Sequence, residues 1–166
     1  MTRSEKSIDL AHRLAPGAED APAIAAPERA ALSHGRLRRL IQETVARLNA
    51  LGIGRGDRVA IVLPNGPEMA TAFIAIAAAA STAPLNPAYR ADELDFYLSD
   101  IGVKAILVGK DETGPAVDVA GRLGICVLRL VVPDGAPAGV FTIEGDSAGA
   151  PVVSGLAKDG DVALLL

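Results

Sequence analysis

Aromatic residues are scarce in this sequence, which has no tryptophan, two tyrosines and three phenylalanines among its 166 residues. Proteins that bind nucleic acids commonly stack bases on aromatic rings and present a basic stripe to the phosphate backbone. Here the formal net charge is -4, and the Arg-rich patch of Arg36, Arg38 and Arg39 is expected on the solvent face of an amphipathic helix. We therefore expect no nucleic-acid partner.

Cysteine and long apolar runs are also nearly absent. The single cysteine, Cys126, cannot form an internal disulfide, and its apolar neighbours predict a small buried side chain in a strand. Residues 1–10 are polar and lack the apolar centre of a signal peptide. The apolar run at 69–80 is shorter than the roughly 20 residues of a membrane-spanning helix. We expect a soluble, cytoplasmic protein without a membrane span.

Groups that carry catalysis are few. The only histidines, His12 and His34, have no Gly-x-Ser-x-Gly motif to pair with, and no Gly-x-x-x-x-Gly-Lys-Ser/Thr loop is present. The acidic cluster of Asp92, Glu93 and Asp95 is explained by the start of a helix, where carboxylates are favourable, better than by a metal site. We predict that these 166 residues contain no catalytic, cofactor-binding or metal-binding residue.

Hydrophobic residues are abundant, at 50% of the chain with a mean hydropathy of +0.33, which is enough for a sizeable core. The most informative stretch is 58–98. It predicts a strand at 59–63 buried on both faces, an alanine-rich helix at 67–80 capped by Asn65 or Gly66, and a strand at 82–85. Between 59 and 85 its single carboxylate is Glu68 and it has no His, Cys, Lys or Arg, so it predicts a scaffold rather than a site.

Further periodic segments flank that stretch. They predict a short helix including Ile8, Leu10 and Leu14, an edge hairpin of 23–26 and 30–32, helices at 37–51 (N-cap Ser33), 91–101 and 115–123, and strands at 104–108 and 125–130. Gly52, Gly54 and Gly56 follow a helix and precede a strand, which predicts a turn and not a dinucleotide-binding loop. The alternation of strands and helices predicts an α/β fold with a mostly parallel sheet.

Three parts of the chain differ in texture. We predict an N-terminal helix and loop at 1–22, an α/β core at 23–130, and a Pro/Gly-rich connection with a truncated strand at 131–166. Residues 162–166 have the pattern of the beginning of a buried strand, without a cap or polar tail. We therefore expect the parent protein to be longer.

Three motifs resemble a known family: Gly-Asp-Arg-Val at 56–59, Leu-Pro-Asn-Gly-Pro-Glu at 63–68 and Pro-Leu-Asn-Pro at 84–87. Together they resemble the N-terminal part of the acyl-adenylate-forming (AMP-binding) enzymes, over about 22–108 specifically and more loosely to 166. The run at 86–93 is most similar to acid-CoA ligases of the oxalate-CoA ligase type. Two positions depart from the family pattern: Arg90 replaces the usual hydroxyl cap, and His34 stands where many members have Tyr.

The resemblance implies an activity for the parent protein. Family members use ATP and magnesium to convert a carboxylate to an acyl-adenylate, and the CoA ligases then transfer the acyl group to CoA. The phosphate-binding loop of the family, rich in Ser, Thr and Gly and ending in Lys, follows a strand that resembles 161–166. The resemblance therefore carries no functional residue of the family onto this chain, which is expected to be inactive alone.

Two hypotheses for function remain open. In the first, the chain is the N-terminal segment of an ATP-dependent acid-CoA ligase, its partners being the rest of the ligase chain and a small carboxylic acid substrate. In the second, it is a non-catalytic interaction module that keeps the ligase scaffold and self-associates through apolar surfaces and a sheet edge that are normally covered.

Overall fold

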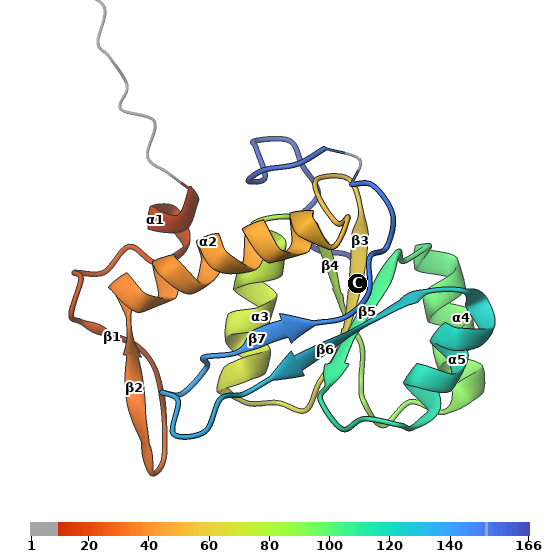
Figure 1. The fold of residues 1–166 in the computed structure, drawn as a ribbon, viewed down its shortest axis with the longest axis horizontal. Helices are drawn as coiled ribbons and strands as arrows, with labels where there is room; N and C mark the ends of the chain where they lie inside the picture. Colours follow the sequence, from red (N-terminus) through yellow and green to blue (C-terminus); the bar gives the residue numbers. More distant parts are fainter. Residues whose placement is uncertain (1–9, 152) are drawn as a thin grey trace, which may run out of the picture.

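A twisted five-stranded sheet with helices on both faces forms the centre of the computed structural model, and a separate two-stranded hairpin lies beside it (Figure 1). The structure describes residues 10–151 and 153–166. The helices are α1 (Leu10–Leu14), α2 (His34–Ala50), α3 (Pro67–Ala77), α4 (Ala91–Ile101) and α5 (Pro115–Leu123). The strands are β1 (Pro22–Ala26), β2 (Arg29–Ser33), β3 (Arg58–Val62), β4 (Ser81–Pro84), β5 (Ala105–Gly109), β6 (Cys126–Val131) and β7 (Thr142–Glu144).

The order of the strands in the sheet is β4-β3-β5-β6-β7. The first four are parallel, with Ala60 opposite both Ala83 of β4 and Ile106 of β5, and β7 runs antiparallel to β6. Helices α2 and α3 lie on one side of the sheet, and α4 and α5 lie on the other (Figure 1). The predicted α/β class with a mostly parallel sheet is therefore confirmed.

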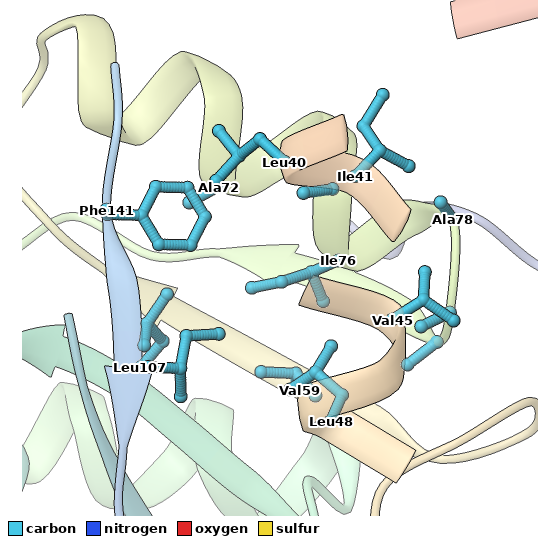
Figure 2. Close-up of a cluster of buried hydrophobic side chains, with 14 of the residues drawn as sticks. Leu40, Ile41, Val45, Leu48, Val59, Ala72, Ile76, Ala78, Leu107 and Phe141 are labelled. Atoms are coloured by element: carbon cyan, nitrogen blue, oxygen red, sulfur yellow. The ribbon is translucent and has the colours of Figure 1, made fainter. Parts of the chain in front are cut away.

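Two apolar cores separate along these faces. Strand β3 supplies both: Val59 and Ile61 pack with α2 and α3, whereas Ala60 and Val62 pack with α4 and α5. Figure 2 shows the first core, where side chains of α2, α3, β3 and β5 meet with Phe141. Val59, Ala60 and Ile61 are fully buried, as the uninterrupted apolar run predicted.

Helix boundaries follow local chemistry. Ser33 is the N-cap of α2, as predicted, its Oγ accepting a hydrogen bond from the N–H of Arg36, so the helix begins at His34, three residues before its apolar face begins at Leu37. Helix α3 ends at Ala77 instead of the predicted residue 80, because residues 78–80 form a turn into β4. Its N-cap is Gly66, which has no side chain to accept a hydrogen bond from the first turn of the helix. Of the predicted N-terminal helix, α1 is present, and Ile8 lies outside the described residues.

The turn between α2 and β3 uses the glycines as predicted. Gly52 has φ +84°, a conformation that side chains with a Cβ rarely adopt, and a Cβ there would lie 1.7 Å from the carbonyl oxygen of Gly149. These glycines lie at the amino end of β3, opposite to the end where a dinucleotide-binding loop would lie.

Three predictions about exposure were wrong. Arg38 is buried, because its guanidinium donates to the carbonyl oxygens of Ala15 and Gly17 and pairs with Glu19. Cys126 is only half-buried, since it begins β6 near the sheet end. Residues 162–166 make one bridge to the sheet instead of a buried strand, and the side chain of Leu166 is fully exposed.

Candidate functional site

The carboxyl ends of β3 and β5 enclose the best candidate site. From β3 the chain crosses through α3 to β4, and from β5 it crosses through α5 to β6 on the opposite side of the sheet. Ligands of open α/β sheets bind in the crevice at such a switch point, outside the carboxyl ends of the strands. A hollow of about 440 Å³ lies there. It is lined by Leu63, Pro64, Asn65, Gly66, Pro67, Glu68, Met69, Gly109, Lys110, Asp111, Leu130 and Val132.

The loop after β5 is held in place while its own side chains stay available. The guanidinium of Arg129, from the neighbouring strand β6, donates to the carbonyl oxygens of Lys110 at 2.9 Å and Glu112 at 2.7 Å. Lys110 and Asp111 are exposed, and within the described residues their side chains form no hydrogen bond or ion pair. A fixed loop that carries a free ammonium and a free carboxylate can bind a polar ligand in the hollow.

Glu68, by contrast, is engaged in holding the fold together. Its Oε1 accepts hydrogen bonds from Arg29 Nη1 at 2.7 Å and from the N–H of Gly139 at 3.0 Å. Arg29 in turn donates to the carbonyl oxygen of Pro137. The only carboxylate between 59 and 85 therefore ties α3 to β2 and to the connection before β7, and it is not a free acid or base.

A second, larger hollow of about 660 Å³ lies at the amino ends of β5 and β6, lined in part by Lys104, Cys126 and Asp146. Lys104 is occupied there: its Nζ donates to the carbonyl oxygens of Gly52 and Ala150 and pairs with Asp57 at 3.2 Å. Burial, with Asp146 nearby, raises the pKa of the Cys126 thiol, which disfavours the reactive thiolate. Despite its size, this hollow has less support as a site than the carboxyl-end hollow.

The remaining titratable candidates are not brought together. His34 begins α2 and does not line the carboxyl-end hollow, and its Nδ1 is buried without a hydrogen-bond partner among the described residues. His12 lies in α1, and its side chain is outside the described part of the structure. No group of three or more His, Cys, Asp or Glu residues that could hold a metal is present among the described residues.

The acidic cluster lies at the start of α4, as predicted, and the structure adds arginine partners that the sequence did not predict. Glu93 accepts a hydrogen bond from the backbone N–H of Arg90 at 2.9 Å. The carboxylate of Asp92 lies 3.6 Å from the guanidinium of the same arginine. Asp95 pairs with Arg122 of α5 at 2.8 Å. These carboxylates therefore stabilise α4 and its packing against α5.

Comparison with known families decides the lineage. The family model described as AMP-binding enzyme matches residues 11–165. The chain belongs to the AMP-binding enzyme family. The oxalate-CoA ligase of Arabidopsis thaliana is 45% identical over 96 residues, which are 57% of this chain and 19% of that protein. The probable CoA ligase CCL9 of Humulus lupulus is 37% identical over 105 residues, 63% of this chain and 20% of that protein.

Solved structures of family members share the arrangement. MatB from Rhodopseudomonas palustris aligns over 95% of this chain and 31% of its own, with 25% identity and a TM-score of 0.70. The ATP-bound form of the same protein aligns with a TM-score of 0.67. The family relationship and the resemblance to acid-CoA ligases predicted from the motifs are thus confirmed. The chain spans about a fifth of the length of the two curated relatives.

Sequence reasoning missed the polar residues of the candidate site. Lys110 and Asp111 directly follow the buried strand β5, and polar residues after a buried parallel strand are a recognisable signal for the ligand-binding edge of a sheet. Arg129 had no such signal, because its position inside β6 says nothing about which loop its guanidinium reaches.

No helix of the described residues is long and apolar enough to cross a membrane.

Proposed function

We propose that this chain is the N-terminal segment of an ATP-dependent acid-CoA ligase, which converts a carboxylate to an acyl-adenylate and then to an acyl-CoA. The family match over residues 11–165 and the 45% identity to an oxalate-CoA ligase support this assignment. A small carboxylic acid is the substrate class, and oxalate is the first acid to test. ATP, magnesium and CoA are the cofactors that the whole enzyme would use.

The observation that carries the proposal is the position of residues 162–165. They lie parallel to β4 on the edge away from β3: the N–H of Thr82 donates to the carbonyl oxygen of Ala163 at 2.9 Å, and the N–H of Leu165 donates to that of Thr82 at 2.8 Å. A segment parallel to β4 runs toward the carboxyl ends of β3 and β5. A phosphate-binding loop that followed it would lie at that end of the sheet, beside the candidate site.

In this proposal the 166 residues supply scaffold and none of the catalytic, cofactor-binding or metal-binding residues of the family, and the loop of Lys110 and Asp111 offers only a polar surface beside the hollow. The acidic residues at the start of α4 pair with arginines, and the described residues do not assemble a metal site, so the residues present do not fit magnesium. We propose the same division into an N-terminal part (1–22), a core (23–130) and a connection (131–166), and a cytoplasmic location.

Exchange of pyrophosphate into ATP tests the proposal. The 166-residue chain is assayed with oxalate, malonate, acetate and a long-chain fatty acid, beside the longest protein encoded by the same reading frame. We expect acid-dependent exchange by the longer protein only. Exchange by the 166 residues alone would overturn the claim that they are inactive, and no exchange by the longer protein with any acid would overturn the ligase assignment.

A second candidate function is an interaction module that self-associates. The observation in its favour is the exposure of apolar side chains within residues 153–166: the side chain of Val153 is 46% exposed, that of Val162 is 56% exposed and that of Leu166 is fully exposed. Exposed apolar edges of this kind promote association. Light scattering across a dilution series distinguishes the two, because a module with this function would keep one stoichiometry, whereas a scaffold segment would not.

A further inference from the structure

Strand β4 carries two hydroxyl groups that are buried, which is unusual for a short strand of a parallel sheet. Ser81 is 6% exposed and Thr82 is fully buried, although a short strand in a parallel sheet is normally filled by aliphatic side chains. A buried hydroxyl without a partner destabilises the folded state, so each one needs an acceptor. Both acceptors come from the segment of 162–165.

The partners are specific. Ser81 Oγ donates to the carbonyl oxygen of Val162 at 2.5 Å, and Thr82 Oγ1 donates to that of Ala163 at 2.8 Å. The backbone of Thr82 adds two further hydrogen bonds: its N–H donates to the carbonyl oxygen of Ala163, and its carbonyl oxygen accepts from the N–H of Leu165. The same short stretch of β4 therefore fixes the segment through its side chains and its backbone together.

We propose that Ser81 and Thr82 are positioning residues that hold the segment of 162–165 in register beside β4. In the whole ligase of the proposed function, a phosphate-binding loop would follow this segment, and the two residues would thereby set the position of that loop. This inference rests on the proposed ligase function. Neither residue contacts the candidate site; they act through the segment. If the segment shifted along β4, the loop would reach the carboxyl end of the sheet at a different height, and its N–H groups would no longer meet the phosphates of ATP.

The first experiment uses amide hydrogen exchange in the 166-residue chain to measure how firmly Ser81 and Thr82 hold the segment of 162–165 beside β4. The variants are Thr82→Val, which keeps the shape and removes the hydroxyl, the double variant Ser81→Ala with Thr82→Val, and Thr82→Ser, which restores the hydroxyl. We expect the N–H of Leu165 to exchange several-fold faster in Thr82→Val, about tenfold faster in the double variant, and near the original rate in Thr82→Ser.

The matched control is Thr71→Val. Thr71 is also fully buried and its Oγ1 donates to a loop carbonyl, that of Gly139 at 2.6 Å, but it lies in α3 and does not touch the segment. Thr71→Val should leave the exchange of Leu165 unchanged. Equal exchange rates of the Leu165 N–H in the original chain and in the double variant would overturn the claim that the two hydroxyl groups hold the segment.

The second experiment uses the longest protein encoded by the reading frame and measures pyrophosphate exchange. We expect Thr82→Val to raise the KM for ATP about three- to tenfold with little change in the KM for the acid, Thr82→Ser to restore it, and Thr71→Val to leave it unchanged. An unchanged KM for ATP in Thr82→Val, in an active protein, would overturn the positioning role alone. Absence of exchange in the unsubstituted protein would instead overturn the ligase assignment, and the positioning role with it.

Discussion

Arg29 and Glu68 form an ion pair with 2.7 Å between Nη1 and Oε1, joining the hairpin strand β2 to the first turn of α3. The two side chains are 30% and 19% exposed, so the pair is largely shielded from water. Because Glu68 also accepts the N–H of Gly139, one carboxylate connects three segments that are far apart in the chain. The only acid between 59 and 85 therefore has a structural role.

Glu68→Gln tests this interpretation. The amide keeps the size of the side chain but removes the charge that Arg29 and Gly139 share, and a hydrogen bond to a charged group contributes roughly 1.5–3 kcal/mol. We expect the free energy of unfolding to fall by about 1–3 kcal/mol in a urea titration. Asp92→Asn is the control, because its pair with Arg90 is exposed, at 3.6 Å, and the pair and the favourable place of Asp92 in the first turn of α4 should together matter by less than about 1 kcal/mol. Equal effects of the two substitutions would contradict the structural role of Glu68.

Two glycine-to-alanine substitutions should change the stability of the protein in opposite directions. Gly52→Ala places a Cβ at φ +84° and against the carbonyl oxygen of Gly149, so we expect destabilisation by more than about 1–3 kcal/mol. Gly121 lies inside α5, and a Cβ there meets no atom within 4 Å. Gly121→Ala should stabilise the protein by about 0.5–1 kcal/mol, because alanine favours the helix. Melting temperatures measure both, and a stabilised Gly52→Ala would show that the turn is wrongly described.

Cys126 should react slowly with alkylating reagents. Burial raises the pKa of its thiol, and its Sγ donates a hydrogen bond to the carbonyl oxygen of Asp146 at 3.4 Å, so the thiolate is scarce near neutral pH. We expect iodoacetamide to modify the folded chain several-fold more slowly than it modifies glutathione at the same pH. In urea the difference should disappear. A folded chain that reacts as fast as glutathione would place the thiol in open solvent.

The sequence predicted the order and type of nearly every element because the signals are local. The uninterrupted apolar run of β3 and the cap at Ser33 each depend on neighbouring residues only. Exposure was harder to predict where long side chains reach distant backbone. Arg38 was placed in solvent because helical periodicity ignores the loop carbonyls of Ala15 and Gly17 that its guanidinium meets.

The candidate site was less predictable than the fold. Lys110 and Asp111 converge on the hollow only because β5 lies beside β3, and the order of strands in a parallel sheet is not encoded in any single segment. The segment of 162–165 is a case in which the sequence predicted burial and the structure shows exposure. Its apolar residues predicted burial, but burial depends on what packs against a strand, and among the described residues the segment pairs with β4 alone, through one bridge.

Arg55 and Asp161 should make part of the stability depend on acid pH. The guanidinium of Arg55 donates from Nε at 2.6 Å and from Nη2 at 3.0 Å, and with the N–H of Lys158 it lowers the pKa of Asp161 from 3.8 to about 2. The unfolded chain therefore takes up the proton first as the pH falls. The contribution of Asp161 to stability is complete above about pH 4 and is lost as the pH falls toward about 2.

Urea titrations at a series of pH values, comparing the original chain with Asp161→Asn, measure this dependence. We expect Asp161→Asn to be less stable at pH 7, and the difference to shrink between about pH 4 and pH 2 until the two proteins converge. Asp159→Asn is the control, since Asp159 is fully exposed and lies 3.9 Å from Arg13. A constant difference between the original chain and Asp161→Asn across this range would show that the Asp161 carboxylate does not keep its charge through the bond to Arg55, and that the segment around Asp161 is held by its backbone contacts instead.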